Sequence, residues 1–185
     1  MLHFGTKAET LALLEGQLEH GKVLPQVRIS VAQWEAAGCS FEGLDENTSD
    51  WLDGTLIVRS SGKAEDSFKE SLAGHFLSVA GVDGQSELNA AIETVIASFC
   101  GDNPDDQVFI QPMLEGVRVS GVAFTRDANS ASHYYIVNYD DKSGATGSVT
   151  DGRSNDLHTF YCAKAAKCRP EGWLGDLLDL LDELE

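Results

Sequence analysis

The chain has 185 residues, with 30 acidic and 13 basic side chains, so its formal net charge is −17 and its pI is about 4.5. This length predicts one domain, or two small lobes, with room for an apolar core. An apolar fraction of 42% excludes a chain that is disordered throughout. The acidic balance argues against nucleic acid and anionic lipid as partners, because both require clustered cations. Any bound anion must therefore be held by a few local cations and backbone amides.

Other classes of protein are excluded by signals that the sequence lacks. No apolar run is long enough for a membrane span, and the N-terminus does not resemble a secretory signal, so we expect a cytoplasmic protein. The four cysteines are scattered and predict reduced thiols. Cys162 and Cys168 with His158 do not fit a zinc spacing, so we predict no metal site among these residues.

Two helices are expected at the start of the chain. Residues Thr6–Glu9 form a capping box, and the leucines that follow at helical spacing predict a helix ending near Gly21. A second, short helix is predicted between Ser30 and Gly38, and residues 39–54 are expected to form a loop.

The rest of the chain alternates strand and helix signals. The predicted strands are 55–58, 108–113, 117–125, 134–139 and 157–162, and the predicted helices are 86–99 and 173–185. Residues 115–116 and 127–132 are expected to be hairpin connections. The last helix carries leucines on one face and acids on the other, and its apolar face needs a cover. This order of elements predicts an α+β fold.

The strongest candidate for a binding site follows the strand 55–58. This strand leads into Arg59, Ser60, Ser61 and Lys63, and a strand that feeds a Gly/Ser-rich loop commonly presents amides and hydroxyls to phosphate. Arg59 adds a permanently charged guanidinium that can bind phosphate through two hydrogen bonds. An ordinary turn, in which Arg59 pairs with a nearby acid of residues 65–66, accounts for the composition equally well.

Two weaker signals lie elsewhere. Lys7 stands in the first turn of a capped helix, where a cation is unfavourable unless an anion shares the site, although a solvated lysine is the simpler reading. In residues 111–113 a proline closes a strand, which predicts either free backbone groups for a ligand or an ordinary edge strand. His75 and His133 are interpreted as structural, and the carboxylate pair at residues 140–141 as a chance pair in so acidic a chain.

These segments resemble four motifs of one enzyme family. Residues 56–74 resemble the VRSSA-x-x-ED-x…S-x-AG signature of phosphoenolpyruvate synthase and pyruvate phosphate dikinase. Residues 111–113 are similar to the Q-x-M hinge of that family, residues 120–127 to its SGVAFTRDP strand, and residues 5–11 to its N-terminal G-x-K-x-x-x-L element. Residues 138–144 and the opening segment look more like the capsule-associated branch, which includes a glutamine kinase.

The resemblance implies an α+β fold that is the first lobe of an ATP-grasp domain, with a mixed, mostly antiparallel sheet and flanking helices. This lobe is expected over residues 1–170, followed by a helix over 171–185 that leads to a second lobe outside the chain. Lys7 and Arg59 are implied to be the catalytic cations that contact the nucleotide phosphates, and residues 60–74 to form a lid. The implied nucleotide-binding set is Lys7, Arg59, Ser60, Ser61, Ser71, Gly74, Gln111, Met113 and Arg126, with Gln111 and Met113 presenting backbone to the adenine.

The implied function is that of the ATP-binding part of a phosphotransferase. Such an enzyme moves a phosphoryl group from ATP through an enzyme histidine to a small acceptor, and its Mg²⁺ ligands and its phosphohistidine domain are expected outside this chain, which by itself would be inactive. Two residues, Gly62 and Ala128, depart from the family pattern, and Gly147 departs from the pattern of the capsule-associated branch. Two alternatives remain open: a stand-alone lobe acting as a regulatory or protein-binding module through its acidic last helix, and an antibiotic phosphotransferase of the rifampin-inactivating type.

Overall fold

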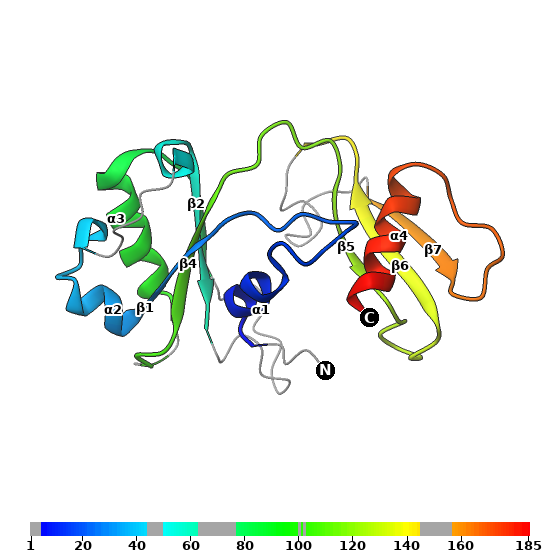
Figure 1. Cartoon of the computed structure of the whole chain (residues 1–185), viewed down its shortest axis with the longest axis horizontal. Coiled ribbons are helices and arrows are strands. Elements are labelled where there is room, and N and C mark those ends of the chain that lie inside the picture. Colours follow the sequence, from blue (N-terminus) through cyan, green and yellow to red (C-terminus); the bar gives the residue numbers. More distant parts are fainter. Residues whose placement is uncertain (1–4, 44–49, 63–76, 100, 102, 145–156) are drawn as a thin grey trace. The chain divides into compact units, whose positions relative to one another are not determined.

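The computed structural model describes residues 5–43, 50–62, 77–99, 101, 103–144 and 157–185 (Figure 1). The chain divides into two compact units. Unit 1 comprises residues 1–17 and 23–113, and unit 2 comprises residues 18–22 and 114–185. Helices accompany strands in both, and every strand pair is antiparallel, which confirms the predicted α+β class. Within the described ranges no helix has the length and apolar character needed to cross a bilayer.

Unit 1 contains a four-stranded sheet, here called sheet A, with strand order β1-β4-β2-β3. Its elements in chain order are α1 (Lys7–Leu14), β1 (Val27–Ser30), α2 (Val31–Ala36), the short 3₁₀ helices η1 (Phe41–Gly43) and η2 (Asp50–Asp53), β2 (Leu56–Ser61), β3 (Ser78–Val82), α3 (Gly84–Ile96) and β4 (Gln107–Pro112). β4 lies between β1 and β2, so it is a central strand of the sheet.

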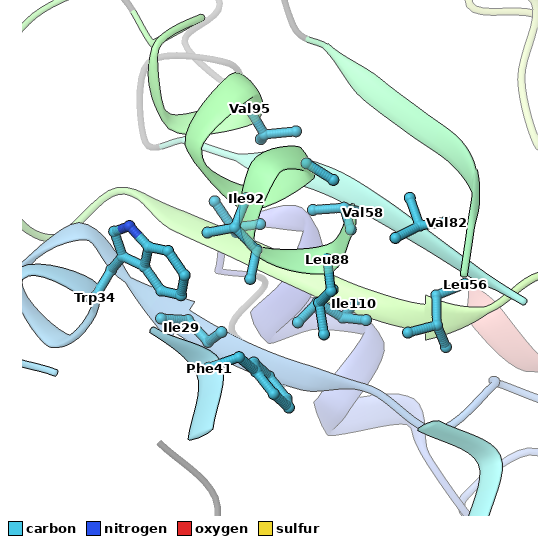
Figure 2. Packing of buried hydrophobic residues seen from close by; sticks show 12 residues of the cluster. Ile29, Trp34, Phe41, Leu56, Val58, Val82, Leu88, Ile92, Val95 and Ile110 are labelled. Atoms are coloured by element: carbon cyan, nitrogen blue, oxygen red, sulfur yellow. The ribbon is translucent and has the colours of Figure 1, made fainter. Parts of the chain in front are cut away.

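One face of sheet A and helix α3 form the core of unit 1 (Figure 2). The buried members are Ile29, Trp34, Phe41, Leu56, Val58, Val82, Leu88, Ala91, Ile92, Val95, Val108 and Ile110. Because side chains alternate between the two faces of a strand, Leu56 and Val58 face this core while Ile57, Arg59 and Ser61 face the opposite side. The strand therefore presents Arg59 away from the apolar layer.

Unit 2 contains a three-stranded sheet, here called sheet B, with strand order β5-β6-β7. Its elements are β5 (Ser120–Phe124), β6 (Tyr134–Asp140), β7 (His158–Ala163) and α4 (Trp173–Leu184). Leu178 and Leu181 of α4 are buried against Tyr135 of β6, with Phe160 of β7 packed beside them. The apolar leucine face predicted for this last helix is therefore covered within unit 2.

Several boundaries differ from the prediction. Helix α1 ends at Leu14, before Gly16, whose φ of 71° lies in the left-handed region. Gly21 does not cap this helix; a Cβ placed on it would lie 2.8 Å from a methyl group of Leu180, so glycine permits close packing on α4. Residues 115–116 do not form a hairpin, because β4 and β5 belong to different sheets, whereas the connection at 127–132 does join the antiparallel pair β5 and β6.

A cluster of polar and charged side chains links α4 to sheet B. The hydroxyl of Tyr135 donates to Asp182, whose carboxylate also binds Arg169, and Arg169 reaches Asp179 with a nitrogen–oxygen distance of 2.7 Å. Lys164 pairs with Glu185 and lies 4.9 Å from the centre of the Tyr135 ring. Burial of the ring, together with its hydrogen bond to Asp182, raises the pKa of Tyr135 to about 12.

We expect the stability of unit 2 to depend on this cluster at both ends of the pH scale. The hydrogen bond from Tyr135 lowers the pKa of Asp182 below its usual 3.8, so the stabilisation is present above that value and is lost as the pH falls below it. The pKa of Tyr135 is raised from 10.0, so its contribution is complete below pH 10 and is lost as the pH rises towards 12. Subtracting the pH titration of tyrosinate absorbance of Tyr135→Phe from that of the wild type isolates Tyr135, and its midpoint should lie near pH 12. A midpoint at pH 10 would contradict the assignment.

Candidate functional site

Two segments that are distant in the sequence meet at the end of strand β2. The hydroxyl of Ser61 accepts a buried hydrogen bond of 2.9 Å from the backbone N–H of Ala8, in the first turn of α1. Beside this contact, the side-chain amide of Gln107 donates to the carboxylate of Glu9 at 3.3 Å. The first turn of α1, which begins with Lys7, is thus fixed to the strand that carries Arg59.

Three of the backbone amides at the start of α1 are already engaged. The predicted capping box is confirmed: the N–H of Thr6 donates to the Glu9 carboxylate at 2.9 Å, and the N–H of Glu9 donates to the Thr6 hydroxyl at 3.5 Å. With the N–H of Ala8 bound to Ser61, three donors of this turn have partners inside unit 1. Any contribution of this turn to a bound phosphate therefore comes mainly from the Lys7 side chain.

Arg59 lies in the middle of the face of sheet A that is opposite α3. Its cross-strand neighbour on β4 is Phe109, and the guanidinium carbon lies 5.4 Å from the centre of the Phe109 ring. Phe109 is fully buried, while Arg59 is partly exposed. A guanidinium held over an aromatic face gains a cation–π attraction and is restricted in orientation. The sequence did not single out Phe109, because identifying it requires the register between β2 and β4.

Ser60 and Ser61 do not belong to a lid. The sequence predicted that strand β2 ends at residue 58. Instead it continues to Ser61, because Ser60 pairs with Val108 and Ser61 with Gln107, the first residue of β4. Both serines are buried, at 2% and 0% exposure. Residues 63–74 of the predicted lid, among them Lys63, Ser71 and Gly74, lie outside the described residues, as does His75.

Residues 111–113, the segment predicted to contact the adenine, lie at the C-terminal end of unit 1. Strand β4 ends at Pro112, as the proline predicted. The side-chain amide of Gln111 donates to the backbone oxygen of Leu24 at 3.3 Å, and the N–H of Met113 donates to the oxygen of Thr55 at 2.9 Å. The Met113 donor is therefore used inside unit 1, whereas its side chain is 38% exposed.

Arg126 and the acidic pair at residues 140–141 belong to unit 2. One guanidinium nitrogen of Arg126 lies 3.5 Å from His133 Nε2, and the other lies 3.9 Å from Glu185. Asp140 is buried and accepts hydrogen bonds from the turn that follows it, including the Ser143 hydroxyl at 2.5 Å. Its carboxylate therefore organises a turn. In the part of the chain that the structure describes, no three His, Cys, Asp or Glu side chains are grouped as metal ligands.

Removing the Ser61 hydroxyl is expected to loosen α1 from strand β2. Ser61→Ala leaves the buried N–H of Ala8 without its acceptor, which should lower the free energy of unfolding by about 1–3 kcal/mol. Ser78→Ala, which truncates an exposed serine of β3, is the matched control and should change it little. Hydrogen exchange at Ala8 is the direct measurement, and unchanged protection there would contradict this role.

Residues 22–104 match the family model of the pyruvate phosphate dikinase AMP/ATP-binding domain. The match includes β1, β2, β3 and α3, and it confirms for this segment the family that the motifs predicted. Arg59, Ser60 and Ser61 lie inside it, whereas Lys7, residues 111–113 and Arg126 lie outside it. The match does not test the assignment to the capsule-associated branch, which stays a prediction. No curated protein matches the chain.

Proposed function

We propose that this chain is the nucleotide-binding part of an ATP-dependent phosphotransferase similar to phosphoenolpyruvate synthase. In this proposal the complete enzyme is cytoplasmic and transfers a phosphoryl group from ATP to an enzyme histidine outside this chain, and from there to a small acceptor. Independently of this proposal, residues 22–104 match the family model of an AMP/ATP-binding domain.

The proposal rests chiefly on the position of Arg59. It lies in the matched segment, on the face of sheet A that carries no α3, and on the strand to which the start of α1 is fixed. A guanidinium can bind two phosphate oxygens at once, and Lys7 adds a second positive charge from the turn bound to Ser61. Two cations would offset negative charge on a phosphoryl group during its transfer, which is the main catalytic requirement of such reactions.

The proposed roles of the other residues are more limited. Gln111 and Met113 are placed beside the adenine, Ser71 and Gly74 in a lid, and Arg126 near the phosphates. Ser60 and Ser61 act by positioning, since their side chains are buried. In the described residues no three His, Cys, Asp or Glu side chains are grouped as ligands for Mg²⁺.

Isothermal titration of the chain with ATP, AMP and adenosine tests the proposal. We expect ATP to bind more tightly than adenosine, and the difference to shrink as salt is raised, because phosphate–cation contacts are screened. Equal affinities for ATP and adenosine, or no binding of either, would overturn the proposal.

The alternative of a protein-binding module gains no support from α4. This alternative assigns the binding surface to the acidic side chains of the last helix. However, Asp179 and Asp182 bind Arg169, and Glu185 binds Lys164. Glu183 accepts the backbone N–H groups of residues 19 and 20. These four acids are engaged inside unit 2. The rifampin-type alternative differs in its acceptor, which the described residues do not specify.

A further inference from the structure

A second arginine lies in the same cross-strand row as Arg59. Strand β4 pairs Phe109 with Arg59 of β2 on one side and with Arg28 of β1 on the other. Residues directly opposite each other in antiparallel strands project to the same face, so all three side chains lie on the face opposite α3. We call Arg28, Phe109 and Arg59 the arginine row.

Arg28 is available to a ligand. It is exposed, and in the described part of the chain it forms no ion pair, although the protein carries a net charge of −17. Neighbouring strands are about 4.8 Å apart, so the Cα atoms of the two arginines are about 10 Å apart. Two long guanidinium side chains can converge on one chain of phosphates across that distance.

The start of strand β1 also contacts α1. The side-chain amide of Gln26, two residues before Arg28, donates to the backbone oxygen of Ala8 at 2.7 Å. Residues two apart in an extended segment project to the same side, which places Arg28 on the side of sheet A where α1 lies. The same face thus carries Arg28 and Arg59 and receives the turn that begins with Lys7.

We propose that Arg28 and Arg59 together bind a polyphosphate along the arginine row, with Phe109 holding the Arg59 guanidinium in place. This inference rests on the proposed function and extends it, because Arg28 belongs to none of the motifs that suggested ATP binding. Its ligand is the phosphate chain of the nucleotide, and the base plays no part in it.

Titrations of Arg28→Gln with ATP, adenosine and inorganic tripolyphosphate test the inference. An exposed, charge-assisted contact predicts a roughly threefold to tenfold weaker affinity for ATP and tripolyphosphate, with adenosine unchanged. Arg118→Gln, which removes an exposed arginine of unit 2, is the matched control for charge, and circular dichroism checks that the variant folds.

The outcomes separate this inference from the proposed function. Unchanged ATP and tripolyphosphate affinities in Arg28→Gln, or losses no larger than those of Arg118→Gln, would overturn the role of Arg28 while leaving ATP binding intact. If the wild type binds tripolyphosphate through Arg28 but binds ATP no more tightly than adenosine, the proposed function fails and the arginine row stands. If the wild type binds neither ATP nor tripolyphosphate, both are wrong.

Discussion

Arg59→Gln is expected to weaken ATP binding by roughly tenfold to a hundredfold, because charge-assisted hydrogen bonds contribute about 1.5–3 kcal/mol. Arg59 projects from the middle of β2, and its guanidinium is held over Phe109. Adenosine affinity should not change, since the residue is assigned to the phosphates. Arg59→Lys keeps the charge but loses the planar fork, so its ATP affinity should lie between those of Arg59→Gln and the wild type.

A matched control distinguishes a local contact from the loss of one positive charge. Arg118→Gln makes the same change of charge at an exposed site in unit 2 and should leave ATP affinity nearly unchanged. Calorimetry with ATP and adenosine measures both effects. If Arg59→Gln binds ATP as the wild type does, Arg59 is not a phosphate ligand; if it loses adenosine equally, its role is structural.

Leu178→Ala is expected to be the most damaging single change in unit 2. Leu178 is fully buried between α4 and sheet B, where it contacts the cluster around Tyr135. Truncating a buried leucine removes apolar contacts and leaves a cavity, and costs about 2–5 kcal/mol of stability. Hydrogen exchange along β6 measures this loss within the unit, which is preferable to one melting temperature because the chain has two compact units.

Leu114→Ala provides the control for this change. Leu114 is 57% exposed, so the same truncation should cost well under the value for Leu178. Equal effects of the two substitutions on exchange in β6 would show that sheet B does not cover the leucine face of α4.

Elements with complete local signals were predictable from the sequence. The capping box at Thr6 is confirmed, since its side chain accepts the hydrogen bond that the spacing predicted, and the short helix predicted from Ser30 begins with a second capping box. Helix α3 follows from apolar residues four and three apart, because that period places them on one face. In the same way Pro112 ends β4, since a proline cannot donate to the next rung of a ladder.

The missed features depend on contacts between distant segments. Strand β1 has four residues with Arg28 among them, and β3 contains a glycine, so neither shows a sustained apolar pattern; both are held by pairing with neighbours. The extension of β2 through Ser61 depends on the length of β4 and on the N–H of Ala8. The row that joins Arg28 to Arg59 requires two registers at once, and no local pattern contains them.

The division of the chain into units gives it an unusual connectivity. The polypeptide passes from one unit to the other three times, because residues 18–22 are part of unit 2 although residues on both sides of them belong to unit 1. This short segment is anchored on α4, where Glu183 accepts two of its backbone N–H groups at 2.7 and 3.1 Å and Gly21 packs against Leu180. A single proteolytic cut between Met113 and Leu114 would therefore leave the two fragments associated, with residues 18–22 of the first still docked on the second.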